Sequence, residues 1–197
     1  MSPRNRDESS FDGRAESYDS GRLGRWHELI VGRVADVATT TAPVPLHVLD
    51  VGCGTGGMLV ELTLRLPSAL EIVGVDASLP MVERARQRVD GRAHVIQGRA
   101  EALPLPQQHF DLVVTTLSFD HWSDPARGLS EIARVLADDG VVVLADLCGW
   151  WLRTRGRARH RGRLLEQARG AGLELDRRAT IYRIAGLPLV QAFVLTK

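Results

Sequence analysis

The segment Val48-Leu-Asp-Val-Gly-Cys-Gly-Thr-Gly-Gly57 joins a short apolar run to a glycine-rich turn. Gly52, Gly54 and Gly56 have no Cβ atom, so their backbone can adopt angles closed to other residues and can approach a bound molecule closely. Apolar residues then recur at helical spacing until Pro67, which places the turn at the N-terminus of a helix. Free N–H groups at such a terminus attract a carboxylate. The segment therefore predicts a ligand-binding turn between a strand and a helix.

The next apolar run, residues 70–75, ends at Asp76, where a carboxylate can bind both hydroxyls of a ribose. The glycines also satisfy the dinucleotide-binding spacing, but that pattern alone is weakly specific. Asp50, two residues before the first glycine, suits an ammonium or sulfonium group better than a pyrophosphate. The turn and the helix that it opens contain no lysine, which excludes a P-loop. A nucleoside with a positively charged group is favoured, and a nucleotide-dependent oxidoreductase is the alternative.

Several ordered motifs together resemble the class I S-adenosylmethionine (SAM) methyltransferases. They are Asp50-Val-Gly-Cys-Gly-Thr-Gly56, Val75-Asp-Ala-Ser78 with Met81, Glu101-Ala-Leu-Pro104, Phe110-Asp-Leu-Val-Val114 and Leu136-Ala-Asp-Asp-Gly140. The likeness is greatest to the small-molecule branch related to quinone-biosynthesis enzymes, and it extends from about Phe11 onward. It implies SAM as the cofactor, S-adenosylhomocysteine as its product, and transfer of a methyl group to an O, C or N atom of a small molecule. A noncatalytic SAM-binding partner subunit is a further alternative.

The chain alternates predicted strands and helices, which indicates an α/β fold with a doubly wound, mostly parallel sheet. Strands are predicted over residues 46–51, 70–75, 93–97, 110–116 and 140–146. Asp124 and Pro125 suit the start of a helix, and a last helix is expected near residues 164–171. Two final apolar runs, 173–185 and 189–195, predict an antiparallel hairpin joined by Gly186-Leu-Pro188. The resemblance implies a seven-stranded, Rossmann-like sheet in the order 3-2-1-4-5-7-6.

The bulk properties suit one well-cored domain. A chain of 197 residues with 44% hydrophobic content predicts a single domain over residues 1–197. Within it we expect an N-terminal helical lid segment over 1–40 and a cofactor-binding core over 46–146. An insert, the last helix and the hairpin should follow over 147–197. The sequence has neither an apolar segment of membrane-spanning length nor a signal-peptide core, so a cytoplasmic location is the default expectation.

The composition argues against several classes of partner. A net charge of +1 predicts no general attraction to nucleic acid. Enzymes of the resembled class that methylate exocyclic or amide nitrogens often carry a Pro-Pro-aromatic turn, and here that place reads Thr116-Leu-Ser-Phe119. Cys53 and Cys148 are too few and too dispersed for a disulfide framework or a metal cluster, so no metal is expected. A homodimer is left open.

The resemblance assigns a set of residues to the cofactor. It comprises Asp50, Gly52, Cys53, Gly54, Gly56, Asp76, Ala77, Met81, Arg99, Ala100, Glu101, Thr116 and Leu117. In this assignment the glycines lie close to the methionine part of SAM, and Asp50 helps to bind its ammonium group. Asp76 binds the ribose hydroxyls, and Ala77 and Met81 pack on the adenine. Capping of the following helix is the structural alternative for Asp76, and plain helix core is that for Met81. Arg99 departs from the aspartate common in the family, so the Ala100 backbone or stacking of Arg99 would have to serve the adenine.

A geometric test follows from strand topology, independently of any family. Ligands of open α/β sheets bind beyond the carboxyl ends of the strands, near the point where strand order reverses. The predicted motifs fall at such ends. One crevice should therefore be bordered by Gly52, Asp76, Arg99, Thr116, Leu117 and Ser118.

The acceptor side is less defined. His121, in Ser118-Phe-Asp-His-Trp122, is a candidate base because the ordinary histidine pKa suits proton acceptance near neutrality; a histidine bonded within its loop is the alternative. A base is needed only if the acceptor must lose a proton. Candidate acceptor-binding residues are Tyr18, Trp26, Ser118, Trp122, Trp150 and Trp151, and the adjacent tryptophans suggest a flat aromatic acceptor. The arginine-rich stretch 153–163 is interpreted as a solvated segment, with anchoring of an acidic acceptor as the less favoured reading.

Overall fold

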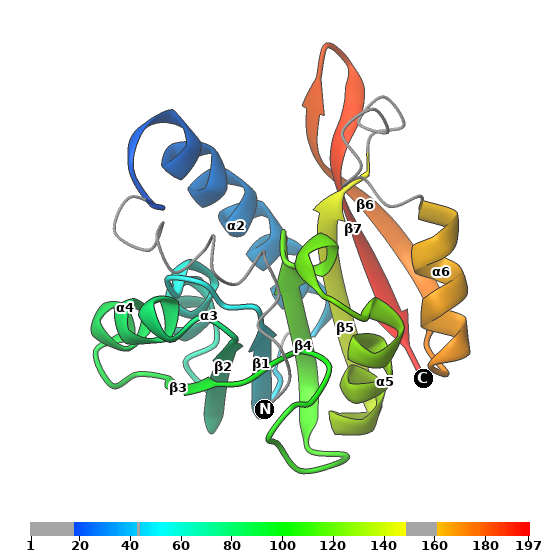
Figure 1. The fold of residues 1–197 in the computed structure, drawn as a ribbon, viewed down its shortest axis with the longest axis horizontal. Helices are drawn as coiled ribbons and strands as arrows, with labels where there is room; N and C mark the ends of the chain where they lie inside the picture. Colours follow the sequence, from blue (N-terminus) through cyan, green and yellow to red (C-terminus); the bar gives the residue numbers. More distant parts are fainter. Residues whose placement is uncertain (1–17, 43, 149–160) are drawn as a thin grey trace.

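The structure is a computed structural model that describes residues 18–42, 44–148 and 161–197. Its centre is a seven-stranded sheet in the order β3-β2-β1-β4-β5-β7-β6 (Figure 1). The strands are β1 (His47–Val51), β2 (Glu71–Asp76), β3 (His94–Gln97), β4 (Phe110–Thr116), β5 (Leu136–Leu147), β6 (Glu174–Ile184) and β7 (Leu187–Thr196). Neighbours from β3 to β5 pair in parallel, whereas β7 runs antiparallel to both β5 and β6. The predicted fold class and strand order are confirmed.

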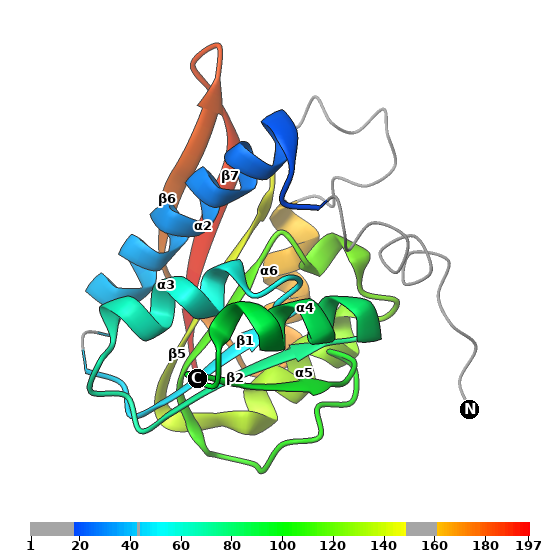
Figure 2. The same cartoon turned by 90° about the vertical axis from the view of Figure 1, so that its left-hand side faces the viewer.

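Helices cover both faces of this sheet, as Figures 1 and 2 show. They are α2 (Gly21–Thr41), α3 (Gly57–Arg65), α4 (Leu79–Val89), α5 (Pro125–Val135) and α6 (Arg161–Gly170), with a short 3-10 helix η1 (Phe119–His121). The core forms two clusters, one beneath α2, α3 and α4 and the other beneath α5 and α6. Because side chains alternate along a strand, β1 sends Val48 into the first cluster and Leu49 into the second.

The start of α5 follows the prediction. Asp124 Oδ1 accepts a hydrogen bond from the backbone N–H of Arg127 at 3.1 Å, and Pro125 occupies the first turn, where its missing N–H costs nothing. Leu129 and Ile132 are fully buried beneath the sheet. Local capping chemistry therefore fixes where the chain turns back after β4.

Two predicted boundaries are wrong. The fifth strand begins at Leu136, not at residue 140, because the backbone becomes extended directly after α5 and Leu136 pairs with Phe110. The hairpin turn consists of Ala185 and Gly186, both at positive φ (48° and 79°), a geometry that matches the twist of the flanking strands. Pro188 lies within β7, beyond the last residue that pairs with β5, so its missing N–H breaks no bond to that strand.

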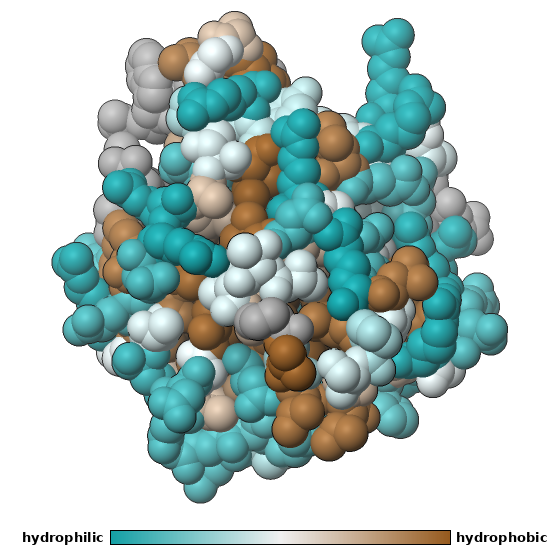
Figure 3. Space-filling model, turned by 180° about the vertical axis from the view of Figure 1, so that it is seen from behind, coloured by the Kyte–Doolittle hydropathy of each residue, from teal (hydrophilic) through white to brown (hydrophobic). Residues whose placement is uncertain are grey.

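Over the face drawn in Figure 3, hydrophilic side chains cover much of the surface, and apolar side chains form several groups between them. None of the described helices is long and apolar enough to cross a membrane. Cys53 and Cys148 are not joined by a disulfide.

Candidate active site

The glycine turn is held against the end of β2. The backbone N–H groups of Gly52 and Cys53 both donate to the carbonyl oxygen of Val75, at 2.7 and 3.1 Å. Gly52 has a φ of 75°, and a Cβ atom there would lie 1.9 Å from Ser118 Oγ and 2.6 Å from Ser118 Cβ. Glycine at this position therefore lets the turn after β1 pack directly on the segment after β4.

The other two glycines of the turn differ in what surrounds them. Gly54 has a φ of 53°, and a Cβ atom on it would meet nothing within 4 Å, so it faces open space. Gly56, at a φ of 83°, precedes α3, and its Cβ would lie 3.1 Å from Ala85 Cα in α4. Gly56 is thus a packing glycine that brings α3 close to α4, and it lines neither of the two pockets described below.

Replacing Gly52 by alanine is expected to destabilise the fold more than replacing Gly54. Both substitutions force a non-glycine residue to positive φ, so that cost is shared. Only Gly52→Ala adds a clash with Ser118, which rotation of the serine hydroxyl cannot relieve because its Cβ is also too close. We expect Gly52→Ala to be less stable than Gly54→Ala by about 1–3 kcal/mol in urea unfolding. Equal stabilities of the two variants would contradict this packing argument.

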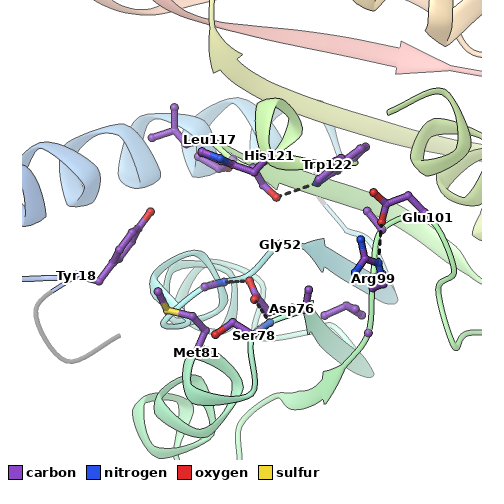
Figure 4. Close-up of a pocket in the computed structure, with 17 residues that line it drawn as sticks. Tyr18, Gly52, Asp76, Ser78, Met81, Arg99, Glu101, Leu117, His121 and Trp122 are labelled. Atoms are coloured by element: carbon purple, nitrogen blue, oxygen red, sulfur yellow. Dashed lines mark hydrogen bonds and ion pairs between the residues drawn. The ribbon is translucent and has the colours of Figure 1, made fainter. Parts of the chain in front are cut away.

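A pocket of about 760 Å³, counting its opening to solvent, lies at the carboxyl ends of β1, β2 and β4. All six residues that the topology places at one crevice line it: Gly52, Asp76, Arg99, Thr116, Leu117 and Ser118. Gly54, Ala77, Met81, Ala100, Glu101, His121, Trp122 and Tyr18 complete most of the wall. In Figure 4, Tyr18 lies across the cavity from Arg99 and Glu101, with Asp76 near its middle. The geometric expectation from the sequence is confirmed.

Asp76 is oriented by backbone donors. Its Oδ2 accepts from the N–H of Gly54 at 2.8 Å, and its Oδ1 accepts from the N–H of Ser78 at 2.9 Å (Figure 4). The N-cap residue of α4 is Ser78, so Asp76 does not cap that helix as the sequence alternative proposed; its bond to the Ser78 N–H fixes the carboxylate just before the helix. This bond does not exclude a ligand, because each carboxylate oxygen can accept a second hydrogen bond. The carboxylate is therefore preset at the pocket wall before any hydroxyl arrives.

Arg99 and Glu101 close the rim of the pocket opposite Tyr18. Glu101 Oε1 accepts from the N–H and the Oγ of Ser123, both at 2.7 Å, and from the N–H of Asp124 at 3.1 Å. Burial alone would raise the pKa of Glu101, but these hydrogen bonds outweigh it and the pKa is lowered. Arg99 Nη2 donates to Ser123 Oγ at 2.9 Å, and its Nε lies 3.6 Å from Glu101 Oε2. A guanidinium only donates, so Arg99 cannot accept from an amino group as an aspartate would.

Apolar surfaces flank the ends of the strands. Met81 is 2% exposed and belongs to α4, yet it also lines the pocket, so the core and ligand readings of this residue coexist. Leu117 has a φ of 54°, which a non-glycine residue holds only when its surroundings enforce it. Its N–H donates to the carbonyl of Ala145 at 2.8 Å, which anchors the strained residue to β5.

A second pocket, of about 740 Å³ with its opening included, lies on the α2 and α3 side of the glycine turn. It shares Tyr18, Gly52, Gly54, Thr116 and Leu117 with the first, and it adds Asp50, Cys53, Asp19, Thr55 and Arg88. Burial, with Asp50 and Asp76 nearby, raises the pKa of the Cys53 thiol well above its ordinary value, which disfavours the reactive thiolate.

Asp50 is the notable group of this second pocket. Its side chain is 1% exposed, and Oδ2 has no hydrogen-bond partner among the residues that the structure describes. Burial, followed by the charge of Asp76, raises the pKa of the Asp50 carboxyl to about 8. A buried carboxyl oxygen without a hydrogen-bond partner is costly, and a bound cation would offset that cost.

The acceptor candidates fall at the β4 and β5 side of the first pocket. His121 lines it from η1, and Trp122 is largely buried, with its Nε1–H donating to Ser118 Oγ at 3.0 Å. Asp146, which the sequence analysis missed, accepts from the N–H of Asp120 at 3.2 Å and so secures η1 to β5. Burial, with a contribution from Asp120, raises the pKa of Asp146 to about 7. The sequence feature that could have pointed to Asp146 is a carboxylate at the end of an apolar strand, the same feature that identified Asp76.

The aromatic residues predicted to bind the acceptor from outside the η1 segment differ in where they lie. Tyr18 lines both pockets, whereas Trp26 lines neither and packs edge-on against Tyr182 of β6, with ring centroids 6.0 Å apart. Trp150 and Trp151 lie outside the described residues, as does most of the arginine-rich stretch. Arg163, in α6, is exposed.

Comparisons with known proteins agree with this geometry. A family described as "Methyltransferase domain" matches residues 49–144. A demethylmenaquinone methyltransferase of Deinococcus radiodurans is 38% identical over 117 residues, which are 58% of this chain and 48% of that protein. A malonyl-[acyl-carrier protein] O-methyltransferase of Geobacter sulfurreducens is 34% identical over 148 residues, 74% of this chain and 54% of that protein. The chain thus spans about half the length of these curated relatives.

A solved structure extends the likeness to the fold. The TehB-like SAM-dependent methyltransferase from Corynebacterium glutamicum superposes with a TM-score of 0.74 at 23% sequence identity, covering 94% of this chain and 98% of that one. The family match contains the glycine turn, Asp76 and the strand ends that line the first pocket. These matches support the resemblance predicted from the ordered motifs: residues 49–144 match a methyltransferase domain, and the chain is similar to demethylmenaquinone and other small-molecule methyltransferases over about half of their length.

Proposed function

We propose that this protein transfers a methyl group from SAM to a small-molecule acceptor. One observation carries the proposal: two pockets share the glycine turn in their walls, and each is lined by a carboxylate suited to a different end of SAM. Asp76 lines the first, where hydroxyls of a nucleoside can reach it, and Asp50, whose Oδ2 has no partner among the described residues, lines the second. A ligand with both a ribose and an ammonium group matches both sites at once.

The rest of the site suits the same ligand. Ala77, Met81 and Ala100 provide apolar surface beside Asp76 for an adenine ring, and Gly54 leaves space where the main chain faces both pockets. Arg99 is engaged with Ser123 and Glu101, so we assign the adenine amino group to backbone acceptors near Ala100. When bound, SAM supplies an activated methyl group, and the residues of the chain need only hold the acceptor in line and exclude water.

The acceptor is proposed to bind beside His121 and Ser118, at the end of β4. Relatives named for demethylmenaquinone and for malonyl-[acyl-carrier protein] methylation make a small organic acceptor reasonable, and an aromatic one is our preferred class. We propose that the enzyme works in the cytoplasm. The family match offers no support for the oxidoreductase alternative.

Ligand binding tests the proposal directly. SAM and S-adenosylhomocysteine should each raise the melting temperature of the protein, whereas NADH should not, because only a ligand of the native state stabilises it. Stabilisation by NADH alone would contradict the proposal. Binding of SAM without turnover over a broad panel of acceptors would instead favour a noncatalytic partner subunit.

His121→Asn separates acceptor chemistry from cofactor binding. His121 lines the first pocket on the β4 side, away from Asp76 and Met81, so S-adenosylhomocysteine affinity should change by less than about twofold. Transfer to acceptors that lose a proton should fall by about 100-fold or more, as expected for loss of a positioned base. Transfer to acceptors that need no deprotonation should persist. A loss of cofactor affinity as large as the loss of rate would remove His121 from this role.

A further inference from the structure

The segment just before α2 is tied to the glycine turn and to α4 through one carboxylate. Asp19 Oδ1 accepts a hydrogen bond from Thr55 Oγ1 at 2.9 Å, and Asp19 Oδ2 lies 3.2 Å from Arg88 Nη1. Arg88 Nη1 in turn lies 3.4 Å from Thr55 Oγ1. We call these three side chains the latch, because they close a triangle between three segments that are distant in the sequence.

The latch belongs to one pocket only. Asp19, Thr55 and Arg88 all line the second pocket, and none of them lines the first. Asp50 also lines only the second pocket, whereas Asp76 lines only the first. The latch therefore stands at the end of the site that suits an ammonium group, opposite the end that suits a ribose.

The backbone couples Asp19 to its neighbours. A Cβ atom on Gly24 would lie 2.1 Å from the carbonyl oxygen of Asp19, so the first turn of α2 packs directly on this residue. Tyr18, adjacent to Asp19, lines both pockets, and its ring lies 4.8 Å from that of His27 in α2. Holding Asp19 in place therefore also holds Tyr18, which lines both pockets and lies at one side of the first in Figure 4.

The strength of the latch is limited by solvent. The side chains of Asp19 and Arg88 are 31% and 32% exposed, so water and salt screen part of their attraction. The hydrogen bond from Thr55 adds a directional contact that screening does not remove. The latch should accordingly shape the second pocket without being essential for folding.

We propose that Asp19 is a positioning residue for the amino-acid tail of the cofactor: with Thr55 and Arg88, it fixes Tyr18 and the outer wall of the second pocket. The inference rests on the proposed binding of SAM. Loss of the latch lets this wall move, so the tail loses its enclosure. The nucleoside end keeps its own contacts around Asp76.

Two ligands that differ only at the tail test this. S-adenosylhomocysteine carries the nucleoside and the amino-acid tail, whereas 5′-methylthioadenosine carries the nucleoside alone. In Asp19→Ala and in Arg88→Gln, calorimetry should show the Kd of S-adenosylhomocysteine rising by about five- to tenfold. The Kd of 5′-methylthioadenosine should change by less than about twofold.

Asp36→Ala is the matched control. Asp36 also pairs with an arginine, Arg65, and joins α2 to α3, but neither residue lines either of the two pockets. This variant should leave both Kd values unchanged. The conservative Arg88→Lys keeps the charge, so it should retain S-adenosylhomocysteine affinity within about threefold.

An equal loss of affinity for both ligands, or no loss for either, would overturn the proposed role of the latch. If Asp19→Ala does not fold, as judged by its thermal melt, the two Arg88 variants carry the test alone. Wild-type protein that binds neither ligand would refute the proposed function and the latch with it. Wild-type protein that binds S-adenosylhomocysteine, with latch variants that do not discriminate between the ligands, would refute the latch only.

Discussion

Asp76→Ala should lower the affinity for SAM and S-adenosylhomocysteine by about 100-fold, measured by calorimetry, because hydrogen bonds to a charged group contribute about 1.5–3 kcal/mol each. The carboxylate is held at the pocket wall by the N–H groups of Gly54 and Ser78, so it is in place to accept from both ribose hydroxyls. 5′-Methylthioadenosine, which contains the same ribose, should lose affinity to a similar extent. Unchanged affinity for these ligands would remove Asp76 from the binding site.

The same substitution also removes two internal hydrogen bonds, so its structural cost must be measured separately. Asp76→Asn keeps one acceptor oxygen for the turn and loses the charge, and it should fall between wild type and Asp76→Ala in affinity. Glu83→Ala, an exposed acidic residue in the neighbouring helix α4, provides a control with the same loss of charge. If Asp76→Ala lowers the melting temperature but Asp76→Asn does not, the affinity of the asparagine variant isolates the contact with the ligand.

The alternation of strands and helices and the lining of the first pocket could be predicted from sequence because both depend on local patterns, whereas the order of the strands came from the family resemblance. Apolar runs and the residues that end them define β1, β2 and β4, and in a parallel sheet the ends of such strands meet at one edge. That Gly52 and Asp76 lie in one pocket could therefore be predicted without knowledge of long-range packing. The start of β5 at Leu136 was missed because the sheet extends the chain directly after α5, without a loop to mark the boundary.

The second pocket could not be predicted in this way. It depends on how α2 and the segment before it lie against α3 and α4, and thus on contacts such as that between Asp19 and Arg88, for which no local pattern exists. Gly56 belonged to the same motif as Gly54, yet one packs on α4 and the other faces open space, a difference that only tertiary structure decides. Trp26 was placed near the acceptor from its position in the chain, whereas its ring packs on Tyr182.

The behaviour of Asp50 on ligand binding depends on its protonation. In the ligand-free protein the pKa of this carboxyl, raised by burial and then by Asp76 to about 8, leaves it mostly protonated at pH 7. The raised pKa means that ionisation opposes folding, so the contribution of Asp50 to stability is greatest below its ordinary pKa of 3.8 and is lost as pH rises toward 8. Asp146, with a pKa of about 7, has the same sign of effect, so a comparison with Asp50→Asn is needed to isolate Asp50.

A ligand ammonium beside Asp50 should reverse this preference and favour the ionised carboxylate. Binding of S-adenosylhomocysteine at pH 7 should therefore release most of one proton, and its affinity should increase by up to about tenfold between pH 6 and pH 7. Calorimetry in buffers of different ionisation enthalpy measures the proton directly. Asp50→Asn should bind more weakly and release no proton, and 5′-methylthioadenosine, which has no ammonium group, should release none from the wild type. Among the described residues that line the second pocket, only Asp50 is fully buried and has a carboxylate oxygen without a partner. If Asp50→Asn still releases a proton on binding, Asp50 is not the source of that proton, and the ammonium group binds elsewhere.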